Sequence, residues 1–376
     1  MASICGSPVC AGGKPKLKFT YTGDYVVRDD GVVELHSSGT LVFIDPAVID
    51  VFMVGGGGKG GRCVMTSSPA YYTANGGGGG GYTRTIKRLA VQGSYEINIG
   101  TGSATANVDG GSTAWGTAYT VAGGKSSTEM PSAPAAANTG RAGGSGGGGG
   151  VISNSDYGTG GSDGNNGEQG YFGPVAGGTG QGFTTREFGE ATGKLYAGGG
   201  GGGRYMVSQT PIVSMGGTGG GGTGGWAGSA SGQLQSPSAG GANTGGGGGG
   251  AAANYTGGMQ GGSGGSGIVC FRNAQELPEL AGTWVLNKRL YKAEATITQS
   301  LNYKLSISST ADWDSIVVNN DGVLTRVAGQ SGYSRLYTFS TNSWGGASLP
   351  VSMAITSTTA SDEFRAWLAS NATKQA

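Results

Sequence analysis

Runs of consecutive glycine are the feature that most restricts what this chain can fold into. Glycine supplies 84 of the 376 residues, and tracts of four to six glycines recur between residues 55 and 250. A tract without side chains has nothing to bury in a conventional core, and glycine loses more conformational freedom on folding than any other residue. Any ordered structure in these tracts must therefore draw its stability from the backbone.

Three interpretations of the tracts differ in how they use that backbone. Flexible linkers are typical of glycine-rich chains. Collagen requires a strict Gly-x-y period and much proline, but the chain has no strict period and only 11 prolines, so collagen is excluded. The third interpretation is an array of left-handed, three-fold extended helices, like polyproline II, whose outward peptide groups bond to neighbouring helices. We expect this array, with a disordered linker as the alternative.

Segments with alternating side chains flank the tracts and predict β-strands. Residues 17–35 alternate with a period near two and contain the turn signal Asp29-Asp30-Gly31. An apolar run at residues 48–54 leads directly into the first tract, and residues 93–100 place Tyr, Ile and Ile on one face. A last strand is predicted at residues 266–272. We expect these strands to frame the glycine tracts.

The composition changes sharply after Arg272. Glycine becomes sparse, and short β-rich segments recur up to Ile355, which is typical of a small β-sandwich. An apolar stripe at residues 361–368 then predicts a short helix. The predicted fold class is all-β plus non-regular: a β-strand frame around packed polyglycine II-like helices, followed by a small C-terminal β-sandwich with a short terminal helix.

These patterns predict three parts of the chain. Residues 1–16 form an N-terminal attachment segment, residues 17–273 form the glycine-rich domain, and residues 274–376 form the C-terminal β-sandwich module. The first part resembles neither of the others, so we expect this end to attach the protein to a larger particle.

Charge and hydropathy exclude several classes of partner. The net charge is +1 and only 12% of residues are charged, so no nucleic-acid partner and no anionic membrane surface is predicted. No apolar run reaches the roughly 18 residues of a membrane-spanning helix, and no membrane insertion is expected. The first residues also lack the apolar core of a secretory signal.

Cysteine and histidine are too few and too scattered for a metal or cofactor site. The four cysteines, Cys5, Cys10, Cys63 and Cys270, show no Cys-x-x-Cys spacing, and His36 is the single histidine. No zinc site is therefore predicted, and a Ser/His/Asp triad would need a histidine from a strand-like segment. Gly-x-Gly-x-x-Gly recurs through composition alone and never joins a strand to a helix, so no nucleotide cofactor is expected. A Cys5–Cys10 disulfide stays open.

Paired carboxylates are the remaining catalytic alternative. Glycoside hydrolysis uses two of them, and five occur in loop-like segments between the tracts: Asp156, Asp163, Glu168, Glu187 and Glu190. Their irregular placement favours solvated loop charges. We therefore expect a protein that is not an enzyme, with a surface-polysaccharide depolymerase as a weaker alternative.

Isolated aromatic residues between the tracts are the candidate binding residues. Tyrosine and tryptophan offer large contact areas at low entropic cost, and binding residues concentrate on loops held by a rigid scaffold. The alternative is that these rings are buried as core residues along the sides of the array. The candidates, chosen for polar neighbours, are Tyr157, Tyr171, Phe172, Tyr205, Trp226 and Tyr255.

Four motifs together resemble the glycine-rich domain of bacteriophage and prophage tail proteins. A strand ends in Val-Gly-Gly-Gly-Gly at residues 51–58, and a tract leads into an aromatic residue and a strand at 76–86. Gly-Ser-Tyr-Glu-Ile-Asn-Ile-Gly stands at 93–100, and a closing Gly-Ser-Gly-Ile-Val at 265–269. Residues 282–375 resemble a small β-module at the ends of tail proteins of phages of gut Firmicutes.

The resemblance implies a structural and receptor-binding role in a virion tail, as a fibre, tip or adhesin. It implies a host cell-surface glycan or protein and other tail proteins as partners, a homotrimer as the assembly, and a location in the virion tail or, after release, outside the cell. A structural subunit of an extracellular glycine-rich filament is the main alternative.

Overall fold

Two compact units make up the chain, Met1–Gln275 and Glu276–Ala376. In the first unit the computed structural model describes residues 17–64, 73–128, 136–137, 139–153, 156–157, 185–206, 214–229, 232–254 and 256–274. In the second it describes residues 282–286, 303–308, 316–318, 324–326, 352–355, 369 and 372–374. The described residues are strands, non-regular backbone and a 3-10 helix at Glu187–Gly189, with no helix of seven residues or more. The predicted fold class, all-β plus non-regular, is confirmed.

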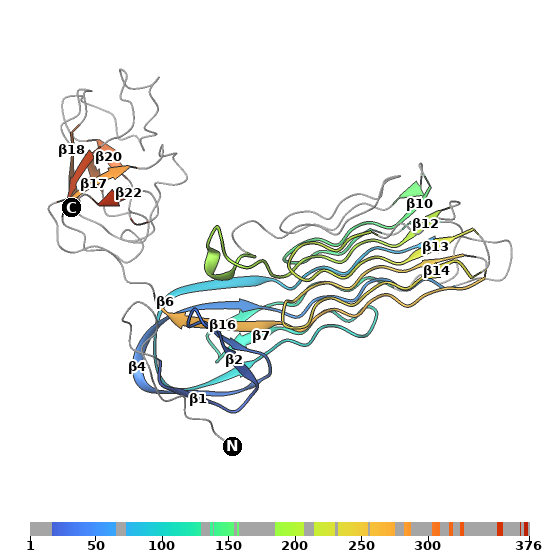
Figure 1. The fold of residues 1–376 in the computed structure, drawn as a ribbon, viewed down its shortest axis with the longest axis horizontal. Helices are drawn as coiled ribbons and strands as arrows, with labels where there is room; N and C mark the ends of the chain where they lie inside the picture. The colour runs from blue at the N-terminus through green and yellow to red at the C-terminus, as the bar shows by residue number, and fades with distance from the viewer. Residues whose placement is uncertain are drawn as a thin grey trace. The chain divides into compact units, whose positions relative to one another are not determined.

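An eight-stranded sheet forms one end of the first unit (Figure 1). Its order is β2–β3–β16–β4–β6–β7–β8, with β1 paired to β4 off this path, and the described pairs are antiparallel. The strands are β1 (Phe19–Tyr21), β2 (Tyr25–Val27), β3 (Val33–Leu35), β4 (Gly39–Val54), β6 (Thr83–Asn98), β7 (Thr113–Trp115), β8 (Tyr119–Val121) and β16 (Ile268–Asn273).

The strand predictions for this sheet are confirmed. The turn at Asp29-Asp30-Gly31 joins β2 to β3, and Gly31 takes the positive φ of 81° that the turn requires. The closing strand β16 returns to pair with the last six residues of β4. Both faces of that half of β4 are buried, since Val51 and Met53 join one core cluster and Phe52 and Val54 another. Burial on both faces explains why the segment is continuously apolar.

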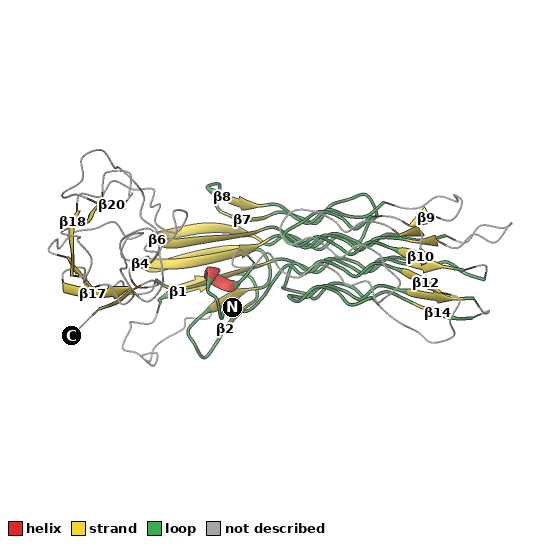
Figure 2. Cartoon of the chain, turned by 90° about the horizontal axis from the view of Figure 1, so that it is seen from above, coloured by secondary structure: helices red, strands yellow, loops and turns green. Residues whose placement is uncertain are grey.

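The glycine tracts leave this sheet as extended segments that lie side by side (Figures 1 and 2). The N–H groups of Gly55, Gly58 and Gly61 donate to the carbonyls of Tyr82, Gly79 and Gly76 at 3.0, 2.9 and 3.0 Å. The intervening Gly57 and Gly60 donate to a different tract, at Gly265 and Gly262. A partner that returns every third residue is the signature of a three-fold helix with outward peptide groups.

Parallel and antiparallel neighbours both occur in this array. The tract at 55–61 runs antiparallel to the tract at 76–81, as the bonds above show. By contrast, Gly198, Gly201 and Arg204 donate to Gly219, Gly222 and Gly225 at 3.1, 2.8 and 2.8 Å, so these two tracts run parallel. The predicted polyglycine II-like packing is therefore a lattice in which each helix bonds to several others.

Close approach of the backbones explains why the tracts are glycine. A Cβ on Gly57 would lie 2.0 Å from the carbonyl oxygen of Gly246, and one on Gly60 would lie 2.0 Å from that of Gly249. Real Cβ atoms essentially never approach a heavy atom within 3.0 Å. Any side chain at these positions would push the tracts apart.

Two small sheets lie at the other end of the array (Figure 2). One has the order β11–β10–β12–β13–β14 and the other β15–β5–β9. Their strands are β5 (Thr73–Ala74), β9 (Ala136–Ala137), β10 (Val151–Ser153), β11 (Asp156–Tyr157), β12 (Arg204–Met206), β13 (Trp226–Gly228), β14 (Leu234–Gln235) and β15 (Ala252–Ala253). We call this end of the first unit the far end.

The described strands of the second unit form one six-stranded antiparallel sheet with the order β20–β19–β18–β21–β17–β22. They are β17 (Gly282–Leu286), β18 (Tyr303–Ser308), β19 (Ile316–Val318), β20 (Leu324–Arg326), β21 (Ser352–Ile355) and β22 (Ala372–Lys374). The helix predicted at residues 361–368 lies outside the described residues. Within the described parts of the chain, no helix has the length and apolar character needed to cross a membrane.

Candidate functional site

The far end of the array is where the chain repeatedly passes from one element to the next. Residues 65–72 lead into β5, residues 207–213 follow β12, and residues 230–231 join β13 to β14. These three connections lie outside the described residues, but each follows or precedes a strand of the two small sheets. The array therefore brings β5, β12, β13 and β14 to one end, although β5 is far from the others in the sequence.

A small apolar cluster supports this end. It contains Cys63, Ala74, Ile152, Tyr205, Ala227, Ala251, Ala252, Ala253 and Met259. Asn254 fixes the chain beside it, since its Nδ2 donates to the carbonyl of Gly228 at 2.8 Å and its Oδ1 accepts the N–H groups of Thr256 and Gly257. The far end thus has its own core, separate from that of the eight-stranded sheet.

The six predicted binding aromatics have different positions. Tyr205 and Trp226 lie on the neighbouring parallel strands β12 and β13, and each residue is only 3% exposed. Both are core residues here, as the alternative interpretation of the aromatics expected, so neither offers an exposed ring. Tyr157 lies on β11 at the far end. The others, Tyr171, Phe172 and Tyr255, lie outside the described residues.

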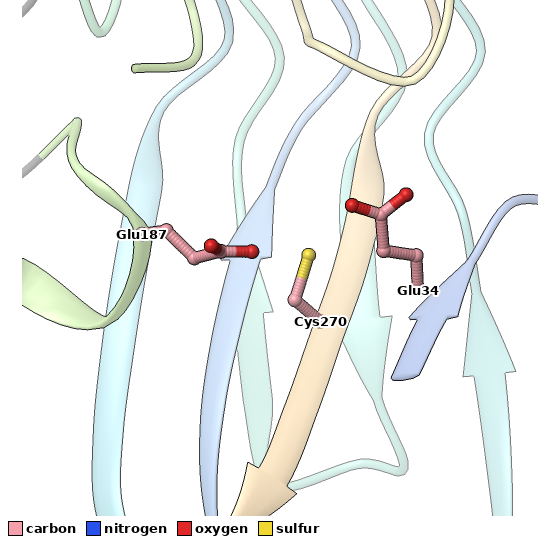
Figure 3. Close-up of side chains that lie close together, drawn as sticks. All are labelled: Glu34, Glu187 and Cys270. Carbon is pink, nitrogen blue, oxygen red and sulfur yellow. The ribbon is translucent and has the colours of Figure 1, made fainter. Parts of the chain in front are cut away.

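A second group of side chains lies on the eight-stranded sheet, beneath residues 185–197, which we call the strap. Cys270 of β16 lies between the carboxylates of Glu34 on β3 and Glu187 on the strap (Figure 3). The sulfur and one oxygen of each carboxylate all lie within 4.8 Å of one another. Sequence reasoning missed this group because its members come from three distant segments and no short motif joins them.

Basic side chains already compensate both carboxylates. Arg28 donates to the two oxygens of Glu187 at 2.9 Å each and to Glu34 at 3.2 Å. Burial alone would raise the pKa of the Glu34 carboxyl, but its contacts with His36, Lys194 and Arg28 together hold this pKa below its ordinary value. A metal ion here would have to displace the bidentate arginine.

The thiol of Cys270 is poorly suited to chemistry. It is fully buried, and burial together with the carboxylates of Glu187 and Glu34 raises its pKa well above the ordinary value. Because the thiolate is the form that attacks substrates and binds metals, this cysteine stays in its inert form at neutral pH. The contacts favour a structural role, in which Glu187 and Arg28 fasten the strap to the sheet.

The other side of the strap is fastened in the same way. Arg272 of β16 pairs with Glu190 and lies over the ring of Phe188, 4.1 Å from its centroid. Phe188 takes a left-handed φ of 52° and packs against Phe52 of β4, 6.4 Å between ring centroids. Two of the five candidate hydrolytic carboxylates, Glu187 and Glu190, are thus arginine partners.

The other three candidate carboxylates are less informative. Asp156 lies on β11, while Asp163 and Glu168 lie outside the described residues. Within the described residues, the carboxylates of Glu187 and Glu190 hold the strap on the eight-stranded sheet.

Comparison with known proteins gives one family. A family model described as a glycine-rich domain matches residues 36–274, from the end of the β2–β3 hairpin to the end of β16. Among curated proteins no match to the chain is found. The matched segment covers the eight-stranded sheet from β4 onward, the whole array and the far end.

Proposed function

The chain belongs to the family of glycine-rich domains, and from this premise we propose that it is a receptor-binding or fibre protein of a bacteriophage tail, without enzymatic activity. In this role the array presents connecting loops to the surface of a bacterial host. The proposed partners are a host cell-surface glycan or protein and other tail proteins, the proposed assembly is a homotrimer, and the proposed location is the virion tail.

The observation that carries the proposal is the arrangement of the array between two ends. Interior tracts such as residues 198–203 and 245–250 are buried along their length and bonded on several sides. Six residues at about 3.1 Å each span about 19 Å, so the array holds the far end at a set distance from the eight-stranded sheet. Ordering so much glycine is unfavourable, and a rigid support for binding loops is a function that needs this stiffness.

The chemistry of the far-end connections supports a neutral partner. Residues 65–72 read Met-Thr-Ser-Ser-Pro-Ala-Tyr-Tyr, and residues 207–213 read Val-Ser-Gln-Thr-Pro-Ile-Val. Neither contains a charged residue, while both contain hydroxyl groups, and the first adds two aromatic rings. Hydrogen-bonding and stacking groups of this kind suit a sugar or an uncharged protein epitope better than a polyanion.

Cell binding by labelled protein tests the proposal. Gly-Ser replacements of equal length at residues 65–72 and 207–213 should abolish binding to host cells or cell-wall fractions. A matched control replaces the exposed turn residues Thr117 and Ala118, between β7 and β8, and should bind like the parent. Amide exchange in the tracts confirms that each variant keeps the array.

Three results would contradict the proposal. Equal binding by the far-end variant and the parent would place recognition elsewhere. If the parent binds no cell and no wall fraction but assembles into fibres, the filament alternative takes its place. Release of reducing sugar from host polysaccharide would instead indicate a depolymerase.

A further inference from the structure

Exposure repeats every third residue in one outer tract of the array. In the tract at residues 122–128, Ala122, Lys125 and Thr128 are exposed, and the four residues between them are buried. The sequence there is Ala-Gly-Gly-Lys-Ser-Ser-Thr. A three-fold helix turns the same side outward at every third residue, so Ala122, Lys125 and Thr128 share that side.

Three neighbouring tracts, residues 101–104, 236–242 and 260–266, carry side chains at every third position and together form one surface. Gly240 donates to the carbonyl of Ser263 at 2.8 Å, and Gly264 donates to that of Ser103 at 2.8 Å, which places the three tracts side by side. Their outward positions, all exposed or half-buried, are Thr101, Ala104, Ser236, Ala239, Ala242, Gln260, Ser263 and Ser266. We call these eight residues the outward row. None of them is charged.

Interior tracts lack such side chains in every direction. All six residues at 76–81 are buried glycines. A Cβ on Gly77, Gly78 or Gly79 would lie 2.1, 2.2 or 1.9 Å from a carbonyl oxygen of a different neighbouring tract. Where the residues facing all three directions are glycine, a neighbouring helix packs on each side. At the outer tracts, side chains occupy the direction in which no further helix packs.

We propose that the outward row terminates the array by keeping a glycine helix of a second copy from packing onto it. The reason is steric, because a further helix packed as closely as the interior tracts would place a carbonyl oxygen about 2 Å from the Cβ of an outward residue, and Cβ atoms do not make so short a contact. Charge repulsion does not supply this protection, since the row is uncharged. The inference concerns association of the chain with itself and is independent of the proposed role in a phage tail.

Glycine substitution in the outward row tests this inference. The test variant carries Thr101→Gly, Ala104→Gly, Ala239→Gly, Ala242→Gly, Ser263→Gly and Ser266→Gly. The matched control carries Thr101→Ser, Ala104→Ser, Ala239→Ser and Ala242→Ser, which keep a Cβ at every position. Sedimentation over a hundredfold range of concentration gives the mass of each protein relative to the parent, and amide exchange reports the array.

The glycine variant should associate as its concentration rises, reaching at least twice the mass of the parent, while the serine control should match the parent throughout. A glycine variant with protected tracts and the parent's mass at every concentration would overturn the inference, as would equal association of the control. If six substitutions unfold the array, Ser263→Gly with Ser266→Gly provides the second test, because this tract already has glycine on both sides of each serine. Association of this double variant with rising concentration would support the inference, and the parent's mass at every concentration would overturn it.

Discussion

Alanine in place of Gly247, in the middle of an interior tract, should destabilise the first unit strongly. The added Cβ would lie 2.1 Å from the carbonyl oxygen of Gly78 and 3.0 Å from the amide nitrogen of Gly200. The first contact must lengthen by about 0.9 Å (3.0 minus 2.1) to reach the shortest separation that Cβ atoms show. Both contacted atoms belong to backbone that is itself packed on other tracts, so no flexible side chain can absorb the shift.

The hydrogen bonds around Gly247 set the size of the effect. Its N–H donates to Gly198 at 2.9 Å, and its carbonyl accepts the N–H of Gly222 at 2.9 Å. A shift of this size stretches two or three such bonds beyond useful length, and each buried unpaired group costs about 1–3 kcal/mol. Alanine loses less conformational entropy than glycine on folding, which returns about 0.5–1 kcal/mol. We expect a net loss of about 2–5 kcal/mol in the free energy of unfolding, a large part of the roughly 5–15 kcal/mol of a typical domain.

Gly241→Ala is the matched control. Its added Cβ would meet only the Thr244 side chain at 3.2 Å and other atoms at 3.4 Å, so its free energy of unfolding should stay within about 1 kcal/mol of the parent. Denaturant unfolding followed by the fluorescence of Trp115 and Trp226 reads both ends of the unit, and amide exchange reads the tracts. Equal stability and equal protection of the two variants would refute the packed array.

Three further predictions concern the strap and the buried thiols. Because its contacts hold the pKa of Glu34 below the ordinary value, Glu34 stabilises the fold above that value and loses its contribution as the pH falls through the folded-state pKa; Glu34→Gln should therefore weaken the dependence of stability on pH below about pH 4.5. Arg28→Ala leaves Glu187 buried and without its bidentate partner, and should lower the free energy of unfolding by about 2–4 kcal/mol. Burial raises the pKa of the Cys63 thiol to about 12 and that of Cys270 well above normal, so peptide mapping should find both unlabelled by a thiol reagent in the native protein and labelled in denaturant.

Each of these predictions has a definite contrary result. An unchanged acid unfolding curve for Glu34→Gln would mean that this carboxyl titrates alike in both states. Lys18→Ala removes an ion pair whose side chains are 60% and 57% exposed, and should leave the free energy of unfolding nearly unchanged; an equally small effect of Arg28→Ala would show that Arg28 does not fasten the strap to the sheet. Rapid native labelling of Cys270 would show that the strap opens readily.

Local patterns were enough to predict the frame. The alternation at residues 93–100, the turn signal at residues 29–31 and the apolar run at residues 48–54 all report the backbone geometry of their own segment. The return of β16 to pair with β4 could also be expected, since a final β-rich segment needed a partner. The three-fold packing of the tracts could be predicted because extended glycine helices have no internal hydrogen bonds and their peptide groups can bond to neighbouring tracts.

Side-chain environment was harder to predict than backbone conformation. Tyr205 and Trp226 have polar neighbours in the sequence, but strand pairing at the far end buries both rings. The group around Cys270 depends on a strap that crosses the sheet, which no local pattern encodes. A signal for the array's edge was present, however, because the Gly-Gly-Ser steps at residues 261–266 place each serine at a half-buried position, whereas the unbroken glycine at residues 76–81 is buried throughout.

The repeat of three gives the tracts an unusual tolerance to changes in their length. Losing one glycine ahead of Lys125 would rotate every later residue of its tract by about 120°, so that the lysine would swing from solvent into the adjoining backbone. Losing three would shorten the helix by one turn and leave each remaining residue aimed as before. Insertions and deletions in the glycine tracts should therefore be tolerated in multiples of three residues, a periodicity that sheets and α-helices do not impose.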